Sequence, residues 1–243
     1  MSRLSQTLAI SLKDTESYYS KPPLITWALI MPAVLLLAVF VKDPQGYLAV
    51  APGIVAMTLL FGNTSMAAIV ITFEKRSGTL NRLLLAPLSH RTIIAGKGLS
   101  AGTYGLATAL VLLLGLHFLL GLPLARPFFL ASGLILGAAI FSLLGLLASV
   151  LVNEVFEAMT LMNYVRFPLL FVSGVFMPLE AMPGWLKPVA FVSPLTHIVD
   201  LLRHGSSGQG FFVQPLIPLA AAALWLALVW LITVRVFPRR VSA

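Results

Sequence analysis

Three side chains that could bind a metal ion are close neighbours late in the sequence. His197, Asp200 and His204 are separated by three and four residues, so a helix would bring them to one face. Imidazole and carboxylate groups are ordinary zinc ligands. Arg203 would lie beside Asp200, however, and its positive charge opposes a bound cation. We therefore favour an interfacial helix that satisfies its own charges through pairs at helical spacing, and we predict no metal site.

A serine nucleophile is the second chemistry to consider. Gly205–Gly208 has the sequence GSSG, which matches the G-x-S-G pattern of intramembrane serine proteases of the rhomboid kind. That chemistry needs a histidine on a later span to activate the serine, and no histidine follows His204. We therefore interpret the segment as a polar loop. Cysteine is absent, which excludes a thiol nucleophile and thiolate metal ligands.

Phosphate-binding and zinc-protease motifs are both missing. The sequence has no G-x-x-x-x-G-K-[ST], and Gly96-Lys97-Gly98 lacks the glycine spacing and the following hydroxyl that would hold phosphate and magnesium. It also lacks H-E-x-x-H, in which two histidines on one helix face bind zinc. We expect a chain that is not an enzyme, binds no cofactor and does not hydrolyse ATP itself.

Two acids and a short polar run complete the chemistry-bearing groups. Glu154 and Glu157 fall in a short connection between two apolar runs. Acids buried in a membrane can relay protons, but a position at the water boundary favours a solvated turn or an acidic contact for a partner. Asn63, Thr64 and Ser65 lie inside an apolar run, where uncharged polar residues serve helix packing more often than substrate binding.

The composition shows which solvent must surround these groups. Hydrophobic residues make up 59% of the 243 residues and charged residues only 10%, whereas a soluble domain carries about 25% charged residues. The net charge of +8 is spread between apolar runs rather than gathered on one domain, so we expect no nucleic-acid partner. The sequence predicts an all-α integral membrane protein whose surroundings are the lipid bilayer.

Six apolar runs are long enough to cross a bilayer, which takes about 20 residues. The predicted spans, which form a single domain over 24–243, are about 24–41, 48–72, 98–121, 128–152, 161–177 and 216–234. Arg166 falls inside the fifth, and we place it near the cytoplasmic end, where its guanidinium can reach the headgroups. With the N-terminus inside, the inner connections hold eleven Lys and Arg and the outer ones four, so both termini are predicted to be cytoplasmic.

Three segments outside the spans have structure of their own. Residues 1–23 form an amphipathic interfacial helix with an apolar stripe made of Leu4, Leu8, Leu12, Thr15 and Tyr19. The inner connection between the second and third spans contains a helix-forming stretch, Thr79–Ala86, that Pro87 ends. The outer connection 178–215 is apolar but broken by Pro178, Pro183, Pro188 and Pro194, which predicts short helices that dip into the outer membrane interface.

Two stretches of this sequence resemble type-2 ABC exporter permeases. The first is FEKRSGTL at 73–80 followed by LLLAP at 83–87, similar to the cytoplasmic signature of that family. The second comprises SGVFMP at 173–178, MPGW at 182–185 and SPLTH at 193–197, similar to the outer end of span five and the re-entrant hairpin. Both lie at the expected places in a six-span order, and the resemblance covers nearly the whole chain.

The resemblance implies a permease subunit that pairs with a second permease chain, in the simplest case as a homodimer. Two copies of a separate ATP-binding subunit, which would hold ATP and Mg, would dock beneath it. The helix between spans two and three would be the coupling helix and residues 1–23 the connecting helix. The residues implied to contact the ATPase are Glu74, Arg76, Gly78, Thr79 and Arg82.

The function implied is ATP-driven export, by alternating access across the cytoplasmic membrane, of a lipophilic or lipid-linked compound such as a drug, an antibiotic or a lipo-oligosaccharide. The path would run between the second and fifth spans of two protomers, and its implied lining residues are Met57, Phe61, Thr64, Met162, Phe167 and Phe171. The alternative is an ion-coupled secondary transporter or channel. It would need a buried ionisable pathway, and no carboxylate lies deep in a predicted span.

Overall fold

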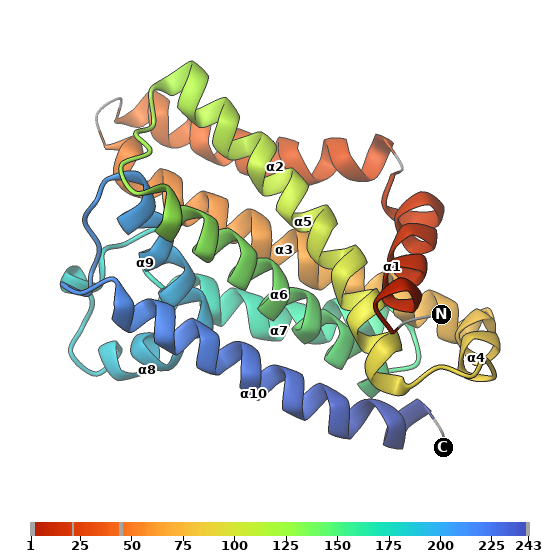
Figure 1. Ribbon diagram of the computed structural model, residues 1–243. Coiled ribbons are helices and arrows are strands. Elements are labelled where there is room, and N and C mark those ends of the chain that lie inside the picture. The colour runs from red at the N-terminus through yellow and green to blue at the C-terminus, as the bar shows by residue number, and fades with distance from the viewer. Residues whose placement is uncertain (1–2, 21, 44–45, 242–243) are drawn as a thin grey trace.

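The computed structural model describes residues 3–20, 22–43 and 46–241, and in this part of the chain every regular element is helical. The elements in chain order are α1 (Arg3–Asp14), the π-helical turn η1 (Thr15–Tyr19), α2 (Pro22–Lys42), α3 (Tyr47–Arg76), α4 (Thr79–Leu84), α5 (His90–Leu120), α6 (Pro127–Leu151), α7 (Val155–Val172), the 3-10 turn η2 (Leu179–Ala181), α8 (Lys187–Val192), α9 (Pro194–Ser206) and α10 (Leu216–Val241), as Figure 1 shows.

Five of the described helices, α3, α5, α6, α7 and α10, are long and apolar enough to cross a membrane. The all-helical membrane class predicted from composition is therefore confirmed. The first predicted span falls in α2, where the apolar stretch among the described residues, Pro32–Lys42, is shorter than a span. A sixth crossing at α2 stays a prediction.

The fifth apolar helix is displaced from its predicted range of 161–177. α7 begins at Val155, because Glu157 accepts hydrogen bonds from the backbone N–H groups of Asn153 and Glu154 (3.1 and 3.3 Å) and so caps the helix. It ends at Val172, just before Gly174 takes a φ of +75°. Glu157 is thus a structural cap. The shift also moves Arg166 from near the start of the helix to its interior.

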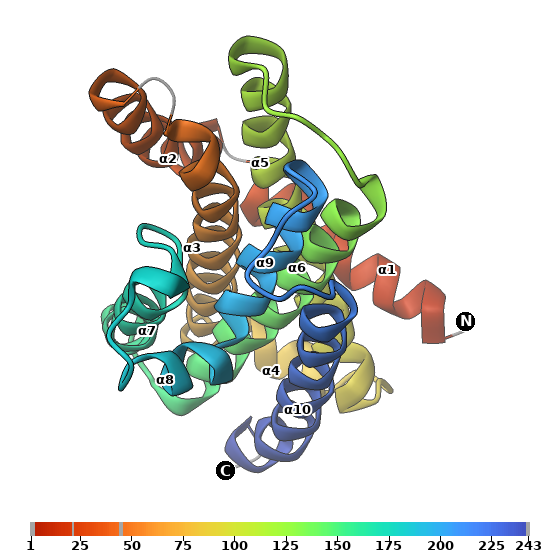
Figure 2. The same cartoon turned by 90° about the vertical axis from the view of Figure 1, so that its left-hand side faces the viewer.

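α3 is the central helix of the bundle. It contacts α2, α5, α6, α7 and α9, and the end-on view in Figure 2 shows α2 and α7 as separate flanks beside it. α6 approaches α3 closely at Gly145, where an added Cβ would lie 2.5 Å from the backbone oxygen of Thr64. A glycine is needed at this position, because any larger residue would force the two backbones apart.

Candidate coupling and transport sites

The predicted helix between the second and third spans is present as α4, and a glycine sets its entry. Gly78 has a φ of +71°, in the left-handed region that favours glycine, so the chain turns sharply between the end of α3 and Thr79. Leu80 is fully buried and anchors α4 beneath the bundle. At the other end, the Ser89 side chain caps α5 by accepting from Thr92 N–H (3.2 Å). α4 is thereby fixed between two membrane-length helices.

The predicted ATPase contacts divide into exposed and buried residues. Arg76 and Arg82 are exposed, and Gly78 and Thr79 are half-buried. Arg76 also forms an ion pair with Glu154, which precedes α7. The prediction that Glu74 contacts the ATPase is corrected here, because its side chain is only 1% exposed and cannot touch a docked subunit in this conformation. Its carboxylate instead points into the protein.

Glu74 belongs to what we call the buried charge cluster, which consists of Lys13, Asp14, Glu74 and Lys97. Lys13 Nζ lies 2.9 Å from Asp14 Oδ1 and 3.0 Å from Glu74 Oε1. Lys97 Nζ lies 2.7 Å from Asp14 Oδ2 and also pairs with Glu74. The cluster therefore joins α1, the last turn of α3 and the first turns of α5, directly beside α4.

The charges of this cluster balance, which is what allows them to be buried. Asp14, Glu74 and Lys97 are each 1% exposed, whereas Lys13 is 47% exposed. Burial lowers the pKa of Lys13, but hydrogen bonding and attraction from Asp14, and then from Glu74, outweigh this and raise it above its ordinary value. Removing one partner from a buried ion pair costs about 3–5 kcal/mol, because the other charge is left uncompensated.

Sequence reasoning missed this cluster. Lys97 drew attention only as part of a failed phosphate-binding motif, and Asp14 only as a polar residue of the amphipathic helix. The leucine stripe of that helix does face away from the protein, with Leu4 and Leu12 exposed. The opposite face, which carries Ile10 and Asp14, packs on the protein. A signal was available at Lys97, which is a lone charge next to an apolar run, whereas Glu74 stands beside Lys75 and Arg76.

A second polar group lies between α3 and α7 and is centred on Arg166. Its side chain is 2% exposed. Nε donates to Thr64 Oγ1 (2.7 Å) and Nη1 to Asn163 Oδ1 (3.3 Å). The guanidinium carbon lies 5.1 Å from the centre of the Phe61 ring, within the range of a cation–π contact. The expectation that Arg166 reaches the headgroups is therefore wrong, since α7 starts earlier than predicted and directs this side chain inward.

The structure brings together half of the predicted lining residues. Phe61 and Thr64 contact Arg166, and Phe167 contacts Phe61 with ring centres 6.2 Å apart. Phe171 is exposed further along α7, next to Phe176. The two methionines do not share this face. Met57 packs in the main core, and Met162 in a small cluster with alanines of α3, α6 and α7, so both are buried helix-packing residues.

The histidines and acid of α9 bind backbone groups. Asp200 accepts hydrogen bonds from Phe211 N–H and Phe212 N–H, the latter at 3.4 Å. His204 Nε2 lies 2.8 Å from Phe212 O, and His197 Nε2 lies 2.9 Å from Phe191 O. No group of three or more acidic or histidine side chains among the described residues is placed to hold a metal ion. These residues fasten α9 to the segments on either side of it.

The hydroxyl of the protease-like segment has a local role as well. Ser207 Oγ donates to Arg203 O at 3.0 Å and lies 3.1 Å from Gln209 O. No described histidine bonds to it, because the His204 ring nitrogen faces Phe212 O instead. The polar-loop interpretation holds only for Ser207 and Gly208, since Gly205 and Ser206 are the buried last residues of α9.

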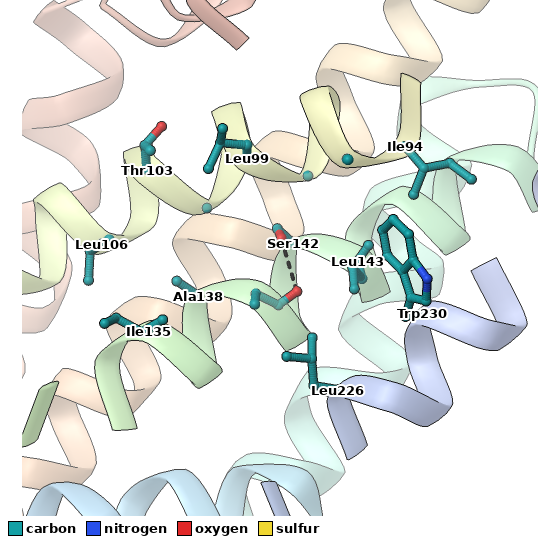
Figure 3. A pocket seen from close by; sticks show the side chains of 14 residues that line it. Ile94, Leu99, Thr103, Leu106, Ile135, Ala138, Ser142, Leu143, Leu226 and Trp230 are labelled. Carbon is teal, nitrogen blue, oxygen red and sulfur yellow. Dashed lines mark hydrogen bonds between the residues drawn. The ribbon is translucent and has the colours of Figure 1, made fainter. Parts of the chain in front are cut away.

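An apolar cavity of about 320 Å³ lies between α5, α6 and α10 (Figure 3). It is lined by small residues on α5 and α6, among them Gly98, Gly102 and Ala138, and by Leu226 and Trp230 of α10. Ser142 also lines it, but its hydroxyl donates to Ala139 O (3.0 Å). The cavity suits hydrocarbon and offers no charged group to a ligand.

These features define a multi-pass helical membrane protein with a short amphipathic helix fastened at one end of the bundle. The sequence pattern of the ABC-2 type transporter family matches residues 5–206, and the chain belongs to that family. The suggested relationship to type-2 ABC permeases is thus confirmed.

Three relatives illustrate the relationship. A Cyanophora paradoxa protein named as a transport permease, ycf38, is 31% identical over 63% of this chain and 53% of its own length. In Escherichia coli K12, the inner membrane transport permease YadH is 27% identical over 65% of this chain and 62% of its own. A protein of the same organism that is named as a multidrug ABC transporter permease, YbhR, is 27% identical over 63% of this chain and 42% of its own length. The chain thus matches about half the length of these relatives.

Proposed function

We propose that this chain is the transmembrane subunit of an ATP-driven exporter and that ATP-binding subunits dock at α4. Family membership supports a transport permease. The buried charge cluster is the main support for the coupling role, because it links the amphipathic helix α1 to the helices on both sides of α4. A push on α4 would then move α1, α3 and α5 together. ATP and Mg would be bound by the partner subunits.

The residues of the α4 end take two different roles in this proposal. Arg82, Thr79 and Gly78 form the contact surface together with Arg76. Glu74 acts as a positioning residue through the cluster rather than as a contact. Rigid movement of packed helices is a common way of carrying such a signal. The α4 end, with both termini, would face the cytoplasm, where Lys and Arg are retained.

The wider architecture is proposed on the same basis. α2 would supply the first of six spans of an inner membrane protein, and α8 and α9 would form the re-entrant hairpin. A second copy of the chain would face α3 and α7 and complete the path, with a lipophilic or lipid-linked compound as cargo. The multidrug name of YbhR and the exposed aromatic residues of α7 support this cargo class.

The ion-coupled alternative finds less support. In the five membrane-length helices, acidic residues occur only at Glu74 and Glu157, within the last or first turn of their helices. A proton or cation path needs ionisable groups in the membrane interior.

The intramembrane protease hypothesis is tested by Ser207→Ala, which is expected to leave transport intact.

The test is purification of the chain together with its ATP-binding subunit, followed by ATP hydrolysis in lipid vesicles. Arg82→Ala should weaken co-purification and lower hydrolysis. The matched control is Arg239→Ala, an exposed arginine in the last turn of α10, which should change neither. If no ATP-binding protein accompanies the wild-type chain and an ion gradient alone drives transport, the proposal is wrong.

A further inference from the structure

Arg166 is a buried cation without a carboxylate partner. The ion pairs within residues 3–20, 22–43 and 46–241 involve Lys13, Arg76, Lys97 and His204 as cations, and none includes Arg166. The two hydrogen-bond acceptors of its guanidinium, on Thr64 and Asn163, are uncharged. One terminal nitrogen, Nη2, is buried and has no hydrogen-bond partner among the described residues.

The depth of Arg166 in the bundle follows from two contacts between α3 and α7. Arg76 pairs with Glu154 at the α4 end, and Thr64 accepts from Arg166 further along. From 76 to 64 on α3 and from 154 to 166 on α7 the separation is 12 residues, so the helices run antiparallel and in register. At 1.5 Å per residue, Arg166 lies about 18 Å from the α4 end. The hydrocarbon layer is about 30 Å thick, which places Arg166 near its middle.

A charge at this depth is costly and points to a functional site. The four-charge cluster at the α4 end shows how this protein buries charges that it pairs internally. Arg166 receives no such pairing, only two dipoles and an aromatic ring. A guanidinium presents its donors in a planar fork that matches phosphate and carboxylate oxygens. The missing partner is therefore an anion.

Aromatic side chains pack over Arg166 and separate it from the surface of the protein. Phe61 lies over the guanidinium and is half-buried, and Phe167, which contacts it, is 48% exposed. Tyr164 is exposed on the same helix. Figure 2 shows α7 beside α3, on the flank of the bundle. A ring can turn aside without breaking a hydrogen bond, so a ligand at this flank could reach Nη2.

We propose that Arg166 binds the anionic group, a phosphate or a carboxylate, of an amphiphile whose apolar part lies along the Phe61–Phe167 face. The free Nη2 donates to the anion, while Thr64 holds Nε in place. The amphiphile is either the transported compound or a resident membrane phospholipid. Only the first identity rests on the function proposed above, since binding itself needs no ATP-binding subunit.

The test compares two amphiphiles of equal chain length, dodecyl phosphate and dodecanol, by thermal unfolding of the protein in dodecyl maltoside. Dodecyl phosphate should stabilise the wild type saturably and dodecanol should not. In Arg166→Met the phosphate should bind about 10- to 100-fold more weakly, the loss expected for a charged hydrogen bond. Arg239→Met removes the same charge from the surface and should bind as the wild type does.

The ligand-free stability of Arg166→Met separates a binding role from a structural one. Because no carboxylate loses its partner, replacing this cation by an apolar side chain should leave the ligand-free unfolding temperature unchanged or raise it. This comparison is made on protein from which phospholipid has been removed, because a retained lipid would itself stabilise the wild type; a marked fall there would make Arg166 a structural residue and would overturn the proposal. Equal stabilisation by the phosphate and the alcohol, or an unchanged phosphate affinity in Arg166→Met, would also overturn it.

A phosphorus assay on the purified protein distinguishes the two sources of the anion. About one phospholipid retained per wild-type chain, and lost in Arg166→Met, identifies a resident lipid. No retained phospholipid together with saturable dodecyl phosphate binding identifies an exchanging compound. Both results support the site. If the phosphate binds but no ATPase couples to the chain, the function proposed above fails and this site remains.

Discussion

Lys97 pairs with two carboxylates inside the protein, and its replacement by methionine tests how α1 is held in place. Lys97 pairs with Asp14 and Glu74, each 1% exposed. Lys13 alone would remain as their counterion, and it is 47% exposed, so water screens part of its attraction. Breaking a buried ion pair from one side costs about 3–5 kcal/mol. We therefore expect Lys97→Met to destabilise the docked position of α1 by this amount.

The docking of α1 can be measured by chemical labelling, because the chain has no cysteine of its own. Ile10 is buried on the face of α1 that packs on the protein. In an Ile10→Cys background, a water-soluble maleimide reacts when α1 moves away. A loss of about 3–5 kcal/mol corresponds to labelling about 10² to 4 × 10³ times faster in Lys97→Met, since each 1.4 kcal/mol is tenfold.

Two further variants separate charge balance from loss of packing. Lys97→Met combined with Glu74→Gln leaves Lys13 and Asp14 as a neutral pair, and we expect labelling to return most of the way to the starting rate. Arg91→Met removes an exposed charge from the same helix and should have no effect. Labelling of Lys97→Met at the unchanged rate, with an unchanged unfolding temperature, would refute the reasoning, because the cluster would then contribute nothing to the docking of α1.

Three further predictions concern the backbone around these sites, all measured by thermal unfolding in detergent. Gly145→Ala should cost about 1–3 kcal/mol, because its Cβ would lie 2.5 Å from Thr64 O; Gly115→Ala, with no atom within 4 Å, is the control and should not destabilise. Gly78→Ala should cost about 1–2 kcal/mol for its φ of +71°, and no cost would show that the turn relaxes. Glu157→Ala should cost about 0.5–2 kcal/mol by removing the cap of α7, whereas an unchanged unfolding temperature would exclude a stabilising cap.

Local patterns in the sequence determined a large part of this structure. Apolar runs predicted the five membrane-length helices, because a span must hide its backbone polar groups within one segment. Proline, glycine and the alternation of leucines with charges predicted α4, with its ends within two residues, and the N-terminal helical segment, which the structure divides into α1 and η1. Other bounds were predicted less well: α7 starts at Val155 rather than 161 because of the cap by Glu157, α5 starts at His90 rather than 98, and α10 continues to Val241 rather than 234. Glu157 had been interpreted as part of a solvated turn.

Only the tertiary structure decided which polar groups meet. Lys97 and Asp14 are 83 residues apart in sequence, and Arg166 and Thr64 are 102 apart. Helical spacing relates residues three or four apart, so it could place Glu74 at the end of a helix but could not show that the helix packing turns it inward. The same limit explains Arg166. Its charge and residue type were evident from the sequence, but its burial without a carboxylate partner follows from the antiparallel register of α3 and α7.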